Sequence, residues 1–293
     1  MAASSLVRPL RLLSAWSSAL AIVAEAGAAP PMRPTALVAY DDVLIETVVQ
    51  GKAGDPAIVI LPSLGRDGYE DYDASAAALT AQGFKVLRPQ PRGIGASKGP
   101  MEGVLLPALA RDVAEVIRQQ GGGRAVVVGH AYGNFVARMT AVAHPEAVRG
   151  VVLAGAQART VAPEIQKAPG IAGNLALPDG ERLAALRLGF FAPGHDPTVW
   201  LHGWYPRTQR MQAASSRGAV TRDAWWHAGT APLLELIPDH DPFKPPEQWN
   251  QLREEFGERI TVKVIEGASH ALFPEQPQAV ADAIAAWART LPP

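Results

Sequence analysis

The 293-residue sequence contains no cysteine, so it can form no disulfide and offers neither a thiolate nucleophile nor a sulfur ligand for a metal. It also lacks a dense run of lysine or arginine, and its formal net charge at pH 7 is −1. A nucleic-acid-binding surface needs concentrated positive charge, so we predict no nucleic-acid partner. Asp239-His240-Asp241 is not accompanied by a further His/Asp cluster, and we therefore predict no metal site. We also predict no cofactor.

The N-terminal region lacks an apolar run long enough for a confident membrane span. Arg8 and Arg11 precede an apolar run over residues 12–24, and small residues follow it up to Ala29. This pattern is typical of a secretory signal peptide over residues 1–29 and predicts an exported protein, periplasmic or secreted, without a stable membrane span in the mature chain. An uncleaved membrane anchor and an organelle transit peptide are the alternatives.

The remaining chain, residues 30–293, is long enough and apolar enough to bury one large core as a single domain, since 48% of all residues are hydrophobic. Apolar segments bounded by turn residues alternate with segments of helical spacing, which implies an α/β protein with a mostly parallel sheet and helices on both faces. Strands are expected over residues 36–49 (a hairpin at the sheet edge), 57–61, 85–88, 126–128, 150–154, 233–237 and 260–265. Helices are expected over about 69–82, 104–119, 246–256 and 276–290, and from residue 135.

Three β-branched residues, Val126 to Val128, run directly into Gly129-His130-Ala131-Tyr132-Gly133, and a helical pattern follows at once. This is the layout of a nucleophile elbow, a sharp strand-to-helix turn that presents its central residue above a sheet. That residue takes a strained backbone conformation, and the flanking glycines let the strand and the helix approach closely. Here the central residue is Ala131, so a methyl group stands where such a turn usually carries a nucleophile.

Two later loops carry the partners that an elbow needs. The strand over 233–237 leads into Pro238-Asp239-His240-Asp241-Pro242, and the strand over 260–265 leads into Glu266-Gly267-Ala268-Ser269-His270. The carboxyl ends of parallel strands share one edge of a sheet, where ligands bind. The order of elbow, acid and histidine, with a strand-by-strand match over about residues 36–291, resembles the α/β-hydrolase superfamily.

This resemblance implies an α/β-hydrolase fold with a helical cap inserted after the sixth strand, at about residues 157–228. It implies that His270 acts as a general base whose tautomer Asp241 fixes, with Asp239 as the alternative acid. It places the two backbone N–H donors of an oxyanion hole at Tyr132 and Leu64. Ser63 stands beside Leu64, where the family commonly has glycine, and its hydroxyl either adds to the site or only caps a turn.

Aromatic residues are concentrated in the segment assigned to the cap, which favours a small to medium apolar substrate or ligand held beneath it. The alternative for each ring is that it packs the cap onto the core. The seven aromatics of this group are Phe190, Phe191, Trp200, Trp204, Tyr205, Trp225 and Trp226.

Ala131 leaves three interpretations open. The residue is a substitution that disarms a serine esterase; or the protein is an enzyme of hydrolase type that works through the His270/Asp241 pair without a covalent nucleophile; or it is a non-catalytic ligand-binding pseudoenzyme. A covalent serine mechanism at residue 131 is impossible in each case. The retained acid and histidine favour the second interpretation, because a site without chemistry has no physical need for both.

Overall fold

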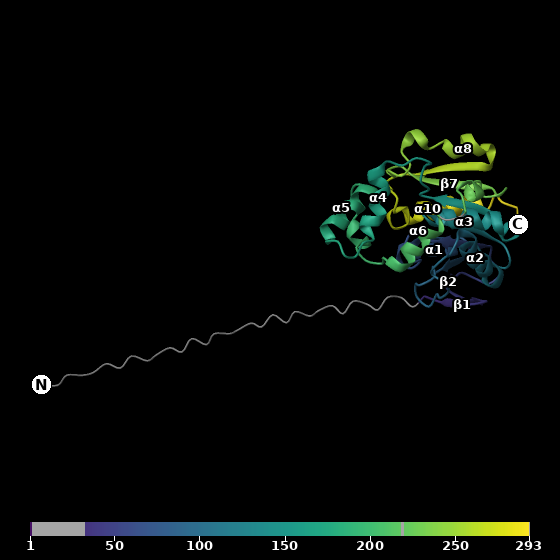
Figure 1. Cartoon of the computed structure of the whole chain (residues 1–293), viewed down its shortest axis with the longest axis horizontal. Helices are drawn as coiled ribbons and strands as arrows, with labels where there is room; N and C mark the ends of the chain where they lie inside the picture. Colours follow the sequence, from purple (N-terminus) through teal and green to yellow (C-terminus); the bar gives the residue numbers. More distant parts are fainter. Residues whose placement is uncertain (2–32, 218–219, 293) are drawn as a thin grey trace. The chain divides into compact units, whose positions relative to one another are not determined.

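A computed structural model of the chain describes Met1, residues 33–217 and residues 220–292, so all of the predicted signal peptide except Met1 lies outside the described part. An eight-stranded sheet has the order β1-β2-β4-β3-β5-β6-β7-β8 (Figure 1). All strand pairs from β4 to β8 are parallel, whereas β2 is antiparallel to both of its neighbours. The strands are β1 Thr35–Tyr40, β2 Val43–Gln50, β3 Ala57–Leu61, β4 Lys85–Pro89, β5 Ala125–His130, β6 Val148–Ala154, β7 Leu233–Pro238 and β8 Ile260–Ile265.

The central strands are buried along their whole length because helices cover both faces of the sheet. Every residue of β3, β5 and β7 is buried, as expected for parallel strands with continuous apolar sequence. The hairpin β1–β2 forms the sheet edge, as predicted, and its two-residue turn places Asp41 at φ +43°. The mostly parallel α/β architecture is thus confirmed.

One face of the sheet packs against α2 (Leu106–Gln120) and α3 (Gly133–Ala143), and the other packs against α1 (Glu70–Ala81) and α10 (Pro277–Ala288). Alternate strand residues enter the two resulting cores. In β5, for example, Val127 belongs to the first core, whereas Val126 and Val128 belong to the second. The period-2 alternation of a strand therefore divides one apolar run between two layers.

The segment after β6 forms a small helical layer with an apolar cluster of its own. This cluster surrounds the fully buried Trp200 and includes Phe190 and Phe191. In Figure 1, α4 and α5 lie side by side at one end of the sheet. The helices between β6 and β7 are α4 Pro163–Ala172, α5 Asp179–Gly189, α6 Pro206–Ser215 and α7 Asp223–Trp226, with a 3₁₀ turn at Pro197–Trp200.

The predicted helix over 246–256 is wrong as a single element. The structure has a 3₁₀ turn, Pro246–Gln248, and a separate helix α8, Gln251–Phe256. The Trp249 indole N–H between them donates to the Lys244 carbonyl at 3.0 Å, which ties the break to the loop after β7. The remaining elements are α9 Leu272–Glu275 and 3₁₀ turns at Pro145–Ala147 and Gly257–Arg259. Within the described residues, we find no helix with the length and apolar character needed to cross a membrane.

Candidate active site

The turn between β5 and α3 has the backbone of a nucleophile elbow although its central residue is alanine. Ala131 has φ +50°, a left-handed conformation that L-residues other than glycine, Asn and Asp rarely adopt. Its N–H donates to the Ala154 carbonyl at 3.0 Å, and the Asn134 amide donates to the carbonyls of Ala131 and Ala154 at 3.0 and 3.1 Å. These bonds to β6 hold residue 131 in the strained conformation.

The elbow glycines are required by close backbone contacts. A Cβ on Gly129 would lie 2.4 Å from the Gly133 carbonyl carbon, and a Cβ on Gly133 would lie 2.5 Å from the Leu61 carbonyl oxygen. Neither backbone atom can move aside without shifting a strand or the helix. The sequence pattern Gly-x-x-x-Gly is therefore explained by the packing of β5 on α3 and β3.

His270 and Asp241 meet at the carboxyl ends of β8 and β7. The His270 Nδ1 lies 2.9 Å from an Asp241 carboxylate oxygen, and both side chains are buried. Because a carboxylate only accepts, the proton is on Nδ1 and Nε2 is the ring's free nitrogen. The other Asp241 oxygen accepts the Phe243 N–H at 2.9 Å, and the Phe243 ring packs on the imidazole with centroids 4.2 Å apart. The expected contact is present, while its catalytic role remains a prediction.

Asp239, the alternative acid, is not the partner of His270. One of its carboxylate oxygens accepts the Ala268 N–H at 3.2 Å, across the loops that follow β7 and β8. This is the turn-capping role that short acidic side chains commonly have. The two acids of Asp239-His240-Asp241 thus have different contacts. Asp239 connects the loops after β7 and β8, and Asp241 contacts the imidazole.

The backbone N–H groups of the loop after β3 differ in whether a described residue accepts their hydrogen bond. Along this loop the Ser63 N–H donates to the Tyr72 hydroxyl at 3.2 Å, the Gly65 N–H to the Gln212 side chain at 2.7 Å, and the Arg66 N–H to the Ser63 carbonyl at 3.2 Å. Within the part of the chain that the structure describes, the Leu64 N–H has no hydrogen bond, and nor does the Tyr132 N–H. These two groups are the pair expected for an oxyanion hole.

Cap residues hold this loop in place; the sequence marked Trp200 and Tyr205 only as aromatics of the cap, and it gave no signal for His202. The Gly65 carbonyl accepts the Tyr205 N–H at 2.8 Å, and Arg66 donates to the Asp71 carboxylate and to the His202 carbonyl, each at 2.9 Å. The Arg66 guanidinium lies 4.2 Å from the Trp200 ring centroid. The loop after β3, called the candidate oxyanion loop below, is therefore positioned by cap residues more than 130 positions away in the sequence.

A buried hydrogen-bond chain joins the candidate oxyanion loop to His270 through Tyr72 and His130. The His130 Nε2 lies 2.7 Å from the His270 carbonyl, and its Nδ1 lies 2.8 Å from the Tyr72 hydroxyl. Since a carbonyl only accepts, Nε2 carries the proton and Tyr72 donates to Nδ1. Burial, with the nearby His270, lowers the pKa of His130 to about 3, which keeps this ring neutral. His130 and Tyr72 thus fix the Ser63 N–H relative to the backbone of the histidine loop.

We expect the free energy of unfolding to fall by about 2 kcal/mol between pH 7 and pH 5 through His130 alone. The unfolded imidazole binds a proton below about pH 6.5, whereas the folded pKa of about 3 keeps His130 neutral there. The contribution of His130 to the free energy of unfolding is therefore fully present above about pH 6.5 and is lost as the pH falls toward 3. Urea unfolding of the wild type and of His130→Gln at both pH values measures this effect as a difference, and equal pH dependences would disprove it.

A cavity of about 150 Å³ contains the candidate catalytic groups. Ser63, Leu64, Ala131, Tyr132 and His270 line it together. Ser63 is 3% exposed, and its hydroxyl has no hydrogen bond to any described residue. The other lining residues are Phe135, Gly155, Gln157, Pro169, Phe190, Trp204, Ala213, Ser216, Arg217 and Phe243. The site residues from three separate loops therefore face one space.

The cap covers this cavity, but only two of its seven aromatics line it. These are Phe190 and Trp204. Trp200 packs inside the cap, while Trp225 and Trp226 belong to the core that contains α3, where the Trp226 ring lies 4.2 Å from the guanidinium carbon of Arg138. Most of the aromatic cluster thus fixes the cap to the core, and Phe135 and Phe243 from outside the cap complete the apolar wall.

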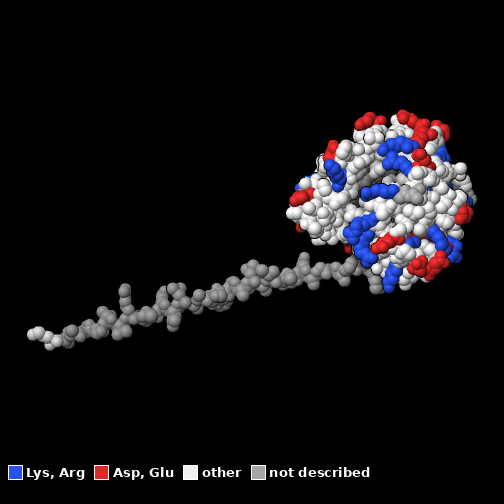
Figure 2. Space-filling model, in the orientation of Figure 1, with Lys and Arg blue, Asp and Glu red and all other residues white. Residues whose placement is uncertain are grey.

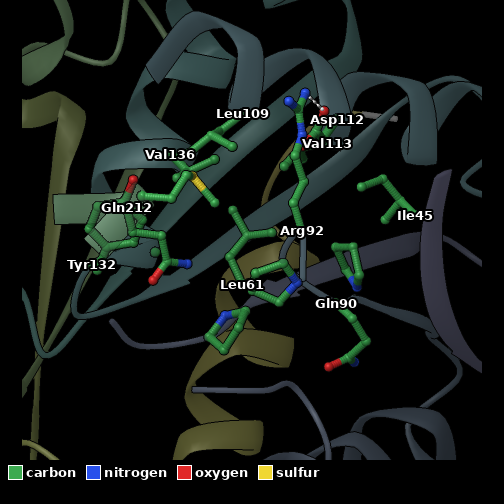
Figure 3. Close-up of a pocket in the computed structure, with 15 residues that line it drawn as sticks. Ile45, Leu61, Gln90, Arg92, Leu109, Asp112, Val113, Tyr132, Val136 and Gln212 are labelled. Atoms are coloured by element: carbon green, nitrogen blue, oxygen red, sulfur yellow. Dashed lines mark hydrogen bonds and ion pairs between the residues drawn. The ribbon is translucent and has the colours of Figure 1, made fainter. Parts of the chain in front are cut away.

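A second cavity, of about 50 Å³, lies at another side of Tyr132 (Figure 3). Leu61, Val136 and Gln212 line it, and the Arg92–Asp112 ion pair, with a shortest contact of 2.7 Å, stands in its wall. Neither Ala131 nor His270 borders it. We therefore assign the reactive position to the larger of these two cavities. The Arg92–Asp112 pair ties the loop after β4 to α2. No cluster of three or more potential metal ligands occurs among the described residues.

Comparisons with known proteins agree with this fold. The family model "Alpha/beta hydrolase family" matches residues 58–283. A hydrolase from Pseudomonas aeruginosa is 23% identical with a TM-score of 0.67, covering 87% of this chain and 98% of the other. An esterase from Exiguobacterium antarcticum is 18% identical, with a TM-score of 0.71 and coverage of 88% and 100%. A bromoperoxidase from Bacillus anthracis is 19% identical, with a TM-score of 0.69 and coverage of 88% and 100%.

The chain belongs to the α/β-hydrolase family, because the family model spans most of its length and the sheet, elbow and loop order agree with it. The likeness to the solved structures concerns the fold, since each is less than 25% identical. The chemistry of a member with alanine at the elbow has to be argued from its own site.

Proposed function

We propose that this protein is a hydrolase that uses His270 as a general base on water to cleave esters of small to medium apolar acyl groups. One observation carries the proposal: His270 directs Nδ1–H to Asp241, and its Nε2 has no hydrogen bond to a described residue while the ring lines the cavity at Ala131. A base in this arrangement can accept a proton without prior rearrangement.

Retention of the strained elbow supports a working site. A left-handed conformation costs a non-glycine residue of order 1–3 kcal/mol and persists only where the surrounding structure enforces it. Packing does not require Ala131 to hold this conformation, because its methyl group only borders a cavity. The turn does, however, bring Tyr132, whose N–H has no hydrogen bond to a described residue, to the cavity that Leu64 also lines.

The steps of the reaction follow from these groups. His270 Nε2 takes a proton from water as the water oxygen bonds to the ester carbonyl carbon, and the carbonyl oxygen becomes negative. The N–H groups of Leu64 and Tyr132 stabilise that charge, and Asp241 stabilises the imidazolium. The carbonyl is then restored, the bond to the alkoxide leaving group breaks, and the imidazolium returns its proton to the leaving oxygen. Ala131 removes the competing covalent step and leaves room for the water.

The cavity supports a small apolar acyl group as the substrate class. Its volume of about 150 Å³ excludes long acyl chains unless the cap moves, and most of its lining side chains are apolar. Phe190, Trp204 and Phe243 supply the aromatic part of this wall. The Ser63 hydroxyl, buried and without a protein partner, is suited to donate a further hydrogen bond to the substrate.

The test is a screen of the purified protein against short-chain esters, lactones and enolisable compounds, with rapid-mixing kinetics and intact-mass spectrometry for any substrate found. We expect ester hydrolysis with linear progress curves, no burst equal to the enzyme concentration and no acylated protein. A covalent acyl adduct would contradict the mechanism. Turnover of enolisable compounds alone would assign His270 to a substrate proton instead of water, and ligand binding without turnover would favour a non-catalytic protein.

A further inference from the structure

One permanent charge borders the cavity, and it is positive. Among the described lining residues, Arg217 is the only one with a full charge, and no aspartate or glutamate lines the space. Its guanidinium has no ion pair or hydrogen bond with a described residue. Gln157, which also lines the cavity, has a side-chain amide that is likewise unpaired within the described ranges. The cavity therefore offers unused donors away from His270.

The neighbouring part of the cap is strongly cationic although the whole chain has a net charge of −1. Residues 197–222 contain four arginines and neither lysine nor an acidic residue. These arginines are Arg207, Arg210, Arg217 and Arg222. Figure 2 shows Lys and Arg side chains along the middle of one face, where the surface is hollowed. Such a local field raises the concentration of anions at an opening.

Two buried arginines of this fold are paired with acidic side chains. Arg66 pairs with Asp71 at 2.9 Å, and Arg92 pairs with Asp112 at 2.7 Å. Arg217 instead follows the last turn of α6 at the border of the cavity, with no such acid in reach. A guanidinium binds a carboxylate through two parallel N–H donors, and this pairing is more specific than charge alone.

From these features we propose that the substrate carries a carboxylate at the end away from its reacting carbonyl, and that Arg217 binds this carboxylate. This inference rests on the proposed function, because that function places the reacting carbonyl at His270. The apolar middle of the substrate packs against Phe190 and Trp204, and the ester carbonyl reaches His270. An ester of an apolar ω-carboxylated acid has this order of groups.

Binding tests the carboxylate preference without requiring catalysis. The probes are 4-phenylbutyrate and its neutral amide, 4-phenylbutanamide, which differ in charge but little in shape. We expect the carboxylate to bind about fivefold more tightly at low salt, the upper range for one exposed ion pair, and the preference to shrink at high salt. Isothermal titration calorimetry gives both affinities.

Arg217→Gln should abolish the preference, because it weakens binding of 4-phenylbutyrate and leaves binding of the neutral amide unchanged. Arg187→Gln is the matched control, because Arg187 is an exposed arginine on cap helix α5 and does not line the cavity. Equal affinity of the two probes, no binding of the carboxylate, or equal effects of the two substitutions would overturn the proposal. A charge preference that persists in a protein without esterase activity would uphold the carboxylate site and reject the proposed hydrolysis, so the two failures are distinguishable.

Discussion

Replacing His270 with alanine should lower the rate of ester hydrolysis by about 10²- to 10⁴-fold, the range for loss of a positioned general base. The remaining rate would come from substrate binding and from the N–H groups of Leu64 and Tyr132, which the substitution does not touch. The measurement is kcat and kcat/KM for the best ester of the screen, with circular dichroism to show that the variant is folded. An unchanged kcat would remove His270 from the mechanism.

The two acids of the loop after β7 provide a matched comparison for this variant. Asp241→Asn retains a side chain of the same size but removes the charge that stabilises the imidazolium, and it permits the wrong tautomer. Its kcat should therefore fall by about 10²-fold or more. Asp239→Asn removes an acid that contacts the Ala268 N–H and not the imidazole, so its kcat should stay near that of the wild type. Equal losses in both variants would mean that the loop, rather than the Asp241–His270 contact, was damaged.

The strands and the order of the site loops could be predicted because both are encoded locally. The apolar run in β3 ends at the turn residues that the sequence shows, and the same holds for β5 and β7. Parallel strands bring their carboxyl ends to one edge, so Asp241 and His270 were expected to meet there, and they lie 2.9 Å apart. The positions of Asp241 and His270 just after the ends of two strands were therefore sufficient to predict that they meet.

The supporting contacts could not be predicted, because they depend on how distant segments pack. Gln212 contacts the Gly65 N–H across 147 residues of sequence, and His130 contacts the His270 carbonyl across 140. Nothing in the local pattern of either residue signals such a partner. The same reasoning explains the aromatics: composition showed that tryptophans cluster in the cap, but only packing shows that Trp225 and Trp226 belong to the core beside α3.

Ala131→Ser is expected to give a gain of about 10²-fold or more on activated esters such as p-nitrophenyl acetate, because a nucleophile held beside a general base reacts faster than free water. The product should appear with a burst equal to the enzyme concentration, since the serine forms an acyl-enzyme that the wild type cannot form. Stopped-flow absorbance measures the burst, and intact-mass spectrometry identifies the acyl group.

The backbone already has the conformation that this serine requires, since Ala131 stands at φ +50° with its N–H bonded to the Ala154 carbonyl. The added oxygen enters a cavity rather than a packed core, so the fold should tolerate it. A distorted oxyanion hole would limit the gain, because loss of one donor costs about 2.7–4 kcal/mol. The deciding comparison is Ala131→Ser against the double variant Ala131→Ser with His270→Ala. A gain that depends on His270 means that the site is arranged for acyl transfer and lacks only its nucleophile. A folded single variant without a gain would count against a hydrolase scaffold and favour the non-hydrolytic or ligand-binding interpretations.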